Sequence, residues 1–367
     1  MNLQQISPLF LALVSFTVSF IVIYLLRPVA PKINLVDRPS VRKQHQGHIP
    51  LIGGIAICLG FAAGMLLLPI SAAPYRALAA GVGILTLIGI LDDMHELSST
   101  KRLLAQCITL LLMMGWGGIK LSYLGDLFAT GPIILDLLIV PLTLFGAISL
   151  INAINLLDGL DGLAGSQVLI SLLALAYCAG AAGHIQQMTL LLIVSGGLMA
   201  FLLFNLPLPG YPSARIFMGD AGSLLLGFVL AWFTIALSSE PNAAARPVTM
   251  LWLVALPLLD LAAVFMHRFR RGVSPFTAGR DHFHHRLQMQ GLSPKKILLI
   301  AVFFALITSG IGLLAERYAI PEYIMLLSFI ILFFGYQHII YTGSFITKGE
   351  HDEQSERYKE RNQEEGN

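Results

Sequence analysis

The residues best suited to chemistry form clusters that interrupt long apolar segments of this 367-residue chain. The first cluster is the adjacent pair Asp92 and Asp93. Two neighbouring carboxylates repel each other unless a cation lies between them, so the pair suits Mg²⁺ or a phosphate bound through Mg²⁺. Taken alone, however, the pair could equally belong to a solvated loop before Lys101 and Arg102.

The second cluster has four polar residues at strict intervals of three: Asn152, Asn155, Asp158 and Asp161. On an α-helix each step of three turns the side chain by about 60°, so neighbours share a face while Asn152 and Asp161 need not. Gly159 and Gly162 predict that the helix loosens here, which would let backbone amides approach a ligand. An ordinary turn would explain one Asp-Gly pair but not two acids and two amides in register.

The third cluster is Phe217-Met218-Gly219-Asp220, at the start of an apolar run. Asp220 is well placed to cap a helix, and that role alone would explain it. A helix N-terminus also attracts anions, and an aspartate beside it can hold the metal that an anion brings. Both interpretations remain open at this point.

The fourth cluster runs from Arg280 to Arg286 and contains three histidines in the longest predicted loop. Imidazole and guanidinium groups can donate hydrogen bonds to phosphate or uridine oxygens. The spacing fits no common zinc site, and no cysteine is near. A weaker candidate is the basic segment from Arg42 to His48, which leads into Gly53-Gly54 and could close over a nucleotide.

The composition that surrounds these clusters identifies an integral membrane protein. Hydrophobic residues make up 56% of the chain and charged residues only 12%, whereas soluble domains carry about 25% charged residues. Disordered, collagen-like and disulfide-rich classes are excluded, and the net charge of +2 provides no polycationic face for nucleic acid.

A membrane core about 30 Å thick needs roughly 20 apolar residues per helical crossing. The chain has about eleven such runs, which predict an all-α, polytopic membrane protein. The runs lie near residues 8–26, 50–69, 76–91, 103–119, 132–151, 163–180, 188–205, 221–237, 248–266, 297–314 and 321–341.

The distribution of lysine and arginine predicts the orientation, because cytoplasmic loops carry the excess. Of the 23 basic residues, all but Arg76, Lys120, Arg246 and Arg317 fall on one set of alternate loops and the tail. This predicts an N-terminus outside, a C-terminus inside and polar clusters on the cytoplasmic side. Residues 1–347 are predicted to form one transmembrane domain, and residues 348–367 a charged cytoplasmic tail.

These residues, in this order, resemble the polyprenyl-phosphate N-acetylhexosamine-1-phosphate transferase family. The resemblance covers about residues 35–292 and looks closest to the bacterial undecaprenyl-phosphate N-acetylglucosamine-1-phosphate transferases. Five motifs carry it: Gly53-Gly54, Leu91-Asp92-Asp93, the segment from Asn155 to Ala164, the segment from Phe217 to Ser223, and His282-Phe283-His284-His285-Arg286. The family's known structures have ten spans, whereas this sequence predicts eleven.

The resemblance implies transfer of GlcNAc-1-phosphate from UDP-GlcNAc to undecaprenyl phosphate, giving undecaprenyl-diphosphate-GlcNAc and UMP. It implies a Mg²⁺ or Mn²⁺ cofactor, the bacterial inner membrane, an active site facing the cytoplasm, and the first membrane step of O-antigen or enterobacterial-common-antigen synthesis.

The residue roles expected from the resemblance fall into three groups. Asp220 and Asp93 are expected as metal ligands, Asp92, Asp93, Asp158 and Asp161 as catalytic residues, and Lys43, Asn155, His282, His284, His285 and Arg286 as substrate-binding residues. Because a phosphate monoester is largely dianionic at pH 7, we expect Asp92 to contribute less as a base than by metal binding and positioning.

Two other functions remain open from the sequence alone. The donor could be a different UDP-N-acetylhexosamine, as in teichoic-acid-linkage enzymes. Asp136 and Asp260, which fall within predicted spans, suggest a cation or proton transporter. Transporters commonly show internal repeats around a site at mid-membrane, whereas the acids here gather at one face, and Asp260 is close enough to support a site there. The sequence also leaves open a homodimer.

Overall fold

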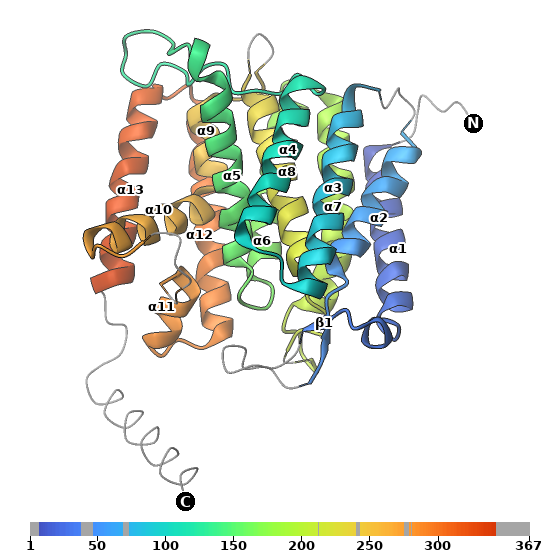
Figure 1. Ribbon diagram of the computed structural model, residues 1–367. Helices are drawn as coiled ribbons and strands as arrows, with labels where there is room; N and C mark the ends of the chain where they lie inside the picture. The colour runs from blue at the N-terminus through green and yellow to red at the C-terminus, as the bar shows by residue number, and fades with distance from the viewer. Residues whose placement is uncertain are drawn as a thin grey trace, which may run out of the picture.

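Long helices run side by side through the molecule in the computed structural model (Figure 1). The structure describes residues 7–37, 47–68, 73–211, 213–239, 243–274, 279 and 281–342. Its helices are α1 (Pro8–Leu26), η2 (Ala30–Ile33), α2 (Gly53–Leu66), η3 (Ala73–Tyr75), α3 (Arg76–His95), α4 (Ser99–Gly115), η4 (Asp136–Leu138), α5 (Ile139–Leu157), α6 (Leu163–Ala181), α7 (Ile185–Asn205), α8 (Gly219–Ser238), α9 (Pro247–Leu253), α10 (Ala255–Arg270), α11 (Phe283–Met289), α12 (Pro294–Arg317) and α13 (Glu322–Thr342). The strands β1 (Val36–Asp37) and β2 (Ile49–Pro50) pair antiparallel, so the described chain is nearly all-α, as predicted.

Every predicted apolar run contains a helix, including the Ala- and Gly-rich run that became α6. Among the described residues, eight helices are long and apolar enough to cross a membrane, and α9 with α10 would make a ninth. The helices α2, with 14 residues, and α4, with 17, are shorter. The chain is therefore built as a multi-pass membrane protein, while the count of eleven spans remains a prediction. The predicted boundary between domain and tail lies beyond Thr342, outside the described residues.

The run at residues 248–266 is not the single straight helix that its hydropathy suggests. It bends by 87° between α9 and α10. Pro257 has no backbone N–H, so it cannot donate to the carbonyl of Leu253 as a continuous helix would require. The Ser171 hydroxyl donates to that carbonyl instead, at 2.6 Å. The hydrogen bond from α6 thus satisfies the backbone group that the bend exposes.

The helix α8 is apolar on all sides and lies buried among its neighbours, as expected for a central helix. Its first turn is held by the segment after β2, where Gly53 N donates to Phe217 O and Gly54 N to Met218 O, both at 3.0 Å. The backbones approach so closely that a β-carbon on Gly54 would collide with Gly222. The predicted Gly53-Gly54 motif therefore serves to position the start of α8.

A cluster of buried hydrophobic side chains joins α10, α11, α12 and α13 to the connection between α5 and α6. Phe283 and Leu287 of α11 pack in it with Leu157 and Leu163, which flank that connection. The histidine segment is thereby fixed beside the Asp158 loop, at the same end of the bundle as β1 in Figure 1. We refer to this end as the carboxylate end.

Candidate active site

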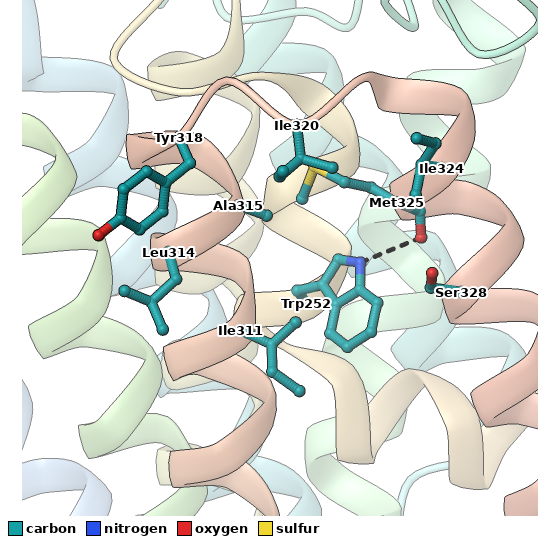
Figure 2. A pocket seen from close by; sticks show the side chains of 9 residues that line it. All are labelled: Trp252, Ile311, Leu314, Ala315, Tyr318, Ile320, Ile324, Met325 and Ser328. Atoms are coloured by element: carbon teal, nitrogen blue, oxygen red, sulfur yellow. Dashed lines mark hydrogen bonds between the residues drawn. The ribbon is translucent and has the colours of Figure 1, made fainter.

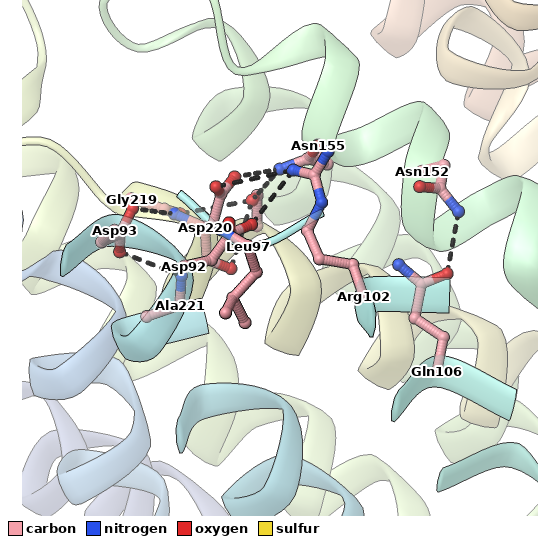
Figure 3. A network of polar contacts seen from close by, with 11 residues as sticks. Asp92, Asp93, Leu97, Arg102, Gln106, Asn152, Asn155, Gly219, Asp220 and Ala221 are labelled. Atoms are coloured by element: carbon pink, nitrogen blue, oxygen red, sulfur yellow. Dashed lines mark hydrogen bonds and ion pairs between the residues drawn. The ribbon is translucent and has the colours of Figure 1, made fainter. Parts of the chain in front are cut away.

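The last turn of α3 meets the first turn of α8 at the carboxylate end, and Asp93 joins them (Figure 3). Its Oδ1 accepts from the backbone N–H of Asp220 at 2.9 Å, and its Oδ2 accepts from that of Ala221 at 3.4 Å. Gly219 has φ +67°, and the carboxylate lies where its β-carbon would be. Asp93 thus caps α8 from a different helix, a position where the macrodipole favours a negative charge.

Asp220 is not the cap of its own helix, contrary to the simpler interpretation of its position. It is the second residue of α8, and Met218 occupies the N-cap position. The Asp220 side chain instead accepts a hydrogen bond from Asn155 Nδ2 of α5 at 2.5 Å, and Asn155 Nδ2 also donates to Ser223 Oγ at 2.8 Å. The helices α3, α5 and α8 converge around this carboxylate.

Arg102 on α4 is a member of this cluster that the sequence did not identify as functional. Its Nη1 lies 3.1 Å from Asp92 Oδ2 and 3.8 Å from Asp220 Oδ2, so one guanidinium connects two carboxylates (Figure 3). Asp92 is nearly buried and also accepts from Leu97 N at 2.7 Å. From the sequence, Arg102 contributes only to the predicted orientation. It lies nine residues after Asp93, and this spacing alone does not predict a contact, because the contact depends on the packing of α4 on α3.

The loop between α5 and α6 forms where the sequence predicts loosening, with Gly162 at φ +75°. Burial, and then the charges of Asp220, Asp93 and Asp161, raise the pKa of Asp158 to about 8. Among the described residues, the carboxylates of Asp92, Asp93, Asp158 and Asp220 therefore outnumber the one guanidinium, that of Arg102, which forms an ion pair with them. Such an excess is what a divalent cation relieves.

The donor chemistry of the cluster fits Mg²⁺ or Mn²⁺. Asp92, Asp93, Asp158 and Asp220 offer carboxylate oxygens and Asn155 an amide oxygen, and hard cations prefer oxygen ligands. In the described part of the chain, no three His, Cys, Asp or Glu side chains already converge as a formed metal site. Binding would therefore require small side-chain movements from the hydrogen bonds seen here.

The Asp161 carboxylate contacts the backbone of the segment that precedes α8. Its Oδ2 accepts from Ala214 N at 2.8 Å, while Asn205 accepts from Gly162 N and donates to Ile216 O. Both side chains fasten the loop to the segment that leads into α8. In this structure Asp161 therefore holds the backbone around the site.

The histidine segment lies against the same loop. His284 is 1% exposed, neither of its ring nitrogens has a hydrogen-bond partner, and Nε2 lies so close to Gly159 that a β-carbon there would collide. Burial, and then the neighbouring His285 and His282, lower the pKa of His284 to about 3. His284 is therefore a neutral imidazole with unused hydrogen-bonding capacity, as expected for a group that meets a ligand.

Other predicted residues either make contacts away from the carboxylate cluster or lie outside the described residues. Arg286 donates to Tyr341 O at 3.4 Å and lies 4.9 Å over the Tyr341 ring. Asn152 pairs with Gln106 at 2.9 Å and does not join the cluster. Lys43 and Arg280 lie outside the described residues.

An apolar cavity of about 310 Å³ lies between α9, α12 and α13, lined by Trp252, Ile311, Leu314, Ala315, Tyr318, Ile320, Ile324, Met325 and Ser328 (Figure 2). Trp252 Nε1 donates to Met325 O across it at 3.3 Å. These residues lie at the ends of α12 and α13 remote from the histidine segment. Among the described residues, no Asp, Glu, Lys, Arg or His lines the cavity, which is separate from the carboxylate cluster.

Comparison with known proteins gives an independent view of the chain. The model of glycosyl transferase family 4 matches residues 75–238. The undecaprenyl-phosphate alpha-N-acetylglucosaminyl 1-phosphate transferase of Escherichia coli K12 is 35% identical over 345 residues, which cover 93% of this chain and 92% of that protein. The protein of the same name from Haemophilus influenzae is 36% identical over 338 residues, covering 91% of this chain and 94% of that protein.

Proposed function

The chain belongs to glycosyl transferase family 4, and from this premise we propose that it transfers GlcNAc-1-phosphate from UDP-GlcNAc to undecaprenyl phosphate. The observation that carries the proposal is the convergence of Asp92, Asp93, Asn155 and Asp220 from three helices around one site. A transporter is disfavoured, because these acids gather where helices end.

The reaction is a phosphoryl substitution. An oxygen of the lipid phosphate attacks the β-phosphorus of UDP-GlcNAc, the bond from that phosphorus to the oxygen bridging the α-phosphate breaks, and UMP leaves with the electron pair. The acceptor is largely dianionic at neutral pH, so the protein must chiefly align the reactants and balance charge. Arg102, between Asp92 and Asp220, is placed to neutralise charge on transferred or leaving oxygens.

Asp220 and Asp92, with Asp158, would hold the divalent cation. A bound Mg²⁺ would neutralise the diphosphate and polarise its phosphorus–oxygen bonds. Asp93 would hold Asp220 in place through its hydrogen bonds to the start of α8, and its role as a metal ligand stays a prediction.

The nucleotide would lie toward the loop between α5 and α6. Neutral His284 can donate one hydrogen bond and accept another, while His282, His285 and Arg286 surround it on the same segment. Asp161 keeps the neighbouring backbone in position. Lys43 remains a predicted contact.

We place this activity at the bacterial inner membrane, with the carboxylate end facing the cytoplasm. In a variant lacking Cys58, Cys107 and Cys178, a single cysteine at Lys120 should react with an impermeant thiol reagent in intact cells, and one at Ser99 should not. The opposite labelling would refute the orientation and leave the chemistry unaffected. A homodimer and the polymer fed by the product remain predictions.

The direct test supplies purified protein in detergent with UDP-GlcNAc, undecaprenyl phosphate and Mg²⁺. Release of UMP that requires both the lipid phosphate and the metal would support the proposal. A panel containing UDP-GalNAc and UDP-GlcNAc would decide between the main donor and the alternative of another UDP-N-acetylhexosamine. Failure to form any lipid-linked sugar from either donor would contradict it.

A further inference from the structure

Asp260 on α10 is a buried carboxylate outside the proposed metal cluster, with 3% of its surface exposed. Its Oδ2 lies 2.9 Å from His282 Nδ1, and its Oδ1 accepts from Phe283 N at 2.8 Å. The Tyr336 hydroxyl of α13 donates to the same Oδ1 at 3.0 Å. One carboxylate therefore gathers the start of α11 and the last helix onto α10.

This arrangement fixes the histidine ring. A carboxylate that already accepts from a backbone N–H and a hydroxyl acts as an acceptor, so His282 Nδ1 must carry the proton of their hydrogen bond. The other ring nitrogen, Nε2, is then the atom through which His282 can meet a ligand. Partners of this kind set the tautomer and the plane of a functional imidazole.

Tyr336, on the last described helix α13, donates a hydrogen bond to the Asp260 carboxylate. It is 6% exposed, and its ring stacks on Phe283, with centroids 6.4 Å apart and an angle of 19° between the planes. Its hydroxyl reaches Asp260 from 76 residues away. Further contacts connect the same helix to the segment, because Tyr341 OH donates to Asp281 O and Gln290 Nε2 to Ile340 O.

We propose that Asp260 and Tyr336 are positioning residues for His282, and that α13 is therefore a working part of the sugar-nucleotide site. The proposal rests on the proposed function and deepens it, since it assigns to two buried residues the orientation of one donor-binding side chain. The competing explanation is a buried hydrogen-bond network that only stabilises the fold. The two explanations differ in which kinetic constant changes.

The experiment compares Tyr336→Phe with Tyr75→Phe. Both variants remove one tyrosine hydroxyl, and Tyr75 OH donates to Gln186 at 3.2 Å beyond the N-terminal end of α3, far from the site. We expect Tyr336→Phe to raise the KM for UDP-GlcNAc roughly fivefold to tenfold, within the range that loss of one typical hydrogen bond produces. The KM for undecaprenyl phosphate should stay within twofold, and Tyr75→Phe should leave both constants unchanged.

These readouts separate positioning from stability, because KM does not depend on the fraction of enzyme that is folded. Asp260→Asn provides a second variant with the same expected selectivity if Tyr336→Phe yields too little protein. In a His282→Ala background, Tyr336→Phe should have no further effect on the donor KM, because the ring it orients is gone.

A Tyr336→Phe enzyme with wild-type donor KM, or with equal changes in both KM values, would overturn the inference. An additive effect in the His282→Ala background would overturn it as well. A wild-type protein that forms no product from UDP-GlcNAc would instead refute the proposed function. The two failures are therefore distinguishable.

Discussion

Two polar networks lie at opposite ends of the bundle, and they differ in charge balance. At the carboxylate end, Arg102 lies between Asp92 and Asp220, and among the described residues it is the one basic side chain in an ion pair with this cluster, which also contains Asp93 and Asp158. At the other end, Glu316 of α12 accepts from Arg246 Nε at 3.1 Å and from the Thr249 hydroxyl, while the rest of the Arg246 guanidinium donates to carbonyls of Ala315 and Ile320.

This difference is what we expect if one network is structural and the other binds a ligand. Glu316 and Arg246 balance each other's charge and form hydrogen bonds that hold α9 and α12 together, so this pair requires no ligand. A cluster with excess negative charge is unfavourable by itself and becomes favourable when a cation arrives. Substitutions at the two ends should therefore change different properties of the protein.

The largest effect is expected for Asp220→Asn. The amide keeps the size and one oxygen but removes the charge that would hold the cation, so kcat/KM should fall roughly a thousandfold or more. The rate of UMP release, measured at saturating Mg²⁺, checks this. Asp126→Asn is the matched control, because Asp126 accepts from Thr130 N and Gly131 N away from the site. Full turnover by Asp220→Asn would show that this charge is dispensable.

A smaller loss is expected for Arg102→Gln. Removing a charged partner of the carboxylates and phosphates should lower kcat roughly 10- to 100-fold, as for charge-assisted hydrogen bonds in general. Arg102→Lys should retain more activity than Arg102→Gln, because it keeps the charge. Steady-state kinetics of both variants provide the measurement, and a wild-type kcat for Arg102→Gln would remove Arg102 from the site.

Glu316→Gln should affect stability and leave catalysis intact. The Arg246–Glu316 pair is about one quarter exposed, so we expect destabilisation of about 1–2 kcal/mol rather than the larger value typical of a fully buried pair. The melting temperature in detergent should fall by a few degrees. Both KM values and the kcat per folded enzyme should match the wild type, and a selective change in one KM would contradict the division between the two ends.

The smallest effect concerns pH and Mg²⁺. Because the folded-state pKa of Asp158 is raised to about 8, its contribution to stability without metal is greatest at low pH and is lost as pH rises through 8. Mg²⁺ needs the ionised carboxylate, so the rise in melting temperature caused by Mg²⁺ should grow by a few degrees between pH 6 and pH 8. Melting curves with Mg²⁺ or EDTA test this, and Asp158→Asn should flatten the trend. A constant Mg²⁺ effect over this pH range would exclude Asp158 from the metal site.

Much of the fold could be predicted from the sequence because apolar runs of helical length leave few alternatives in a membrane. The bend between α9 and α10 could not be predicted in this way. It depends on a hydrogen bond from the Ser171 hydroxyl of α6 to Leu253 O, a contact between distant parts of the chain. The lengths of α2 and α4 likewise depend on packing, which hydropathy does not record.

The site shows the same limit. Paired or regularly spaced acids stand out in an apolar sequence, so Asp92, Asp158 and Asp220 were identified from their types and spacing. Arg102 and Tyr336 have ordinary local sequences, and their roles arise only from contacts between helices. The motif predicts a catalytic Asp161, and the structure adds a contact that the sequence does not predict, in which its carboxylate accepts from Ala214 N.

The central claim is that the carboxylate cluster binds one divalent cation together with the sugar nucleotide. Mn²⁺ binding to the purified protein, followed by electron paramagnetic resonance of the free ion with and without UMP, tests it most directly. We predict one Mn²⁺ per chain, bound more tightly with UMP, with binding lost in Asp220→Asn and retained in Glu316→Gln. Equal Mn²⁺ binding by Asp220→Asn and the wild-type protein would contradict the account.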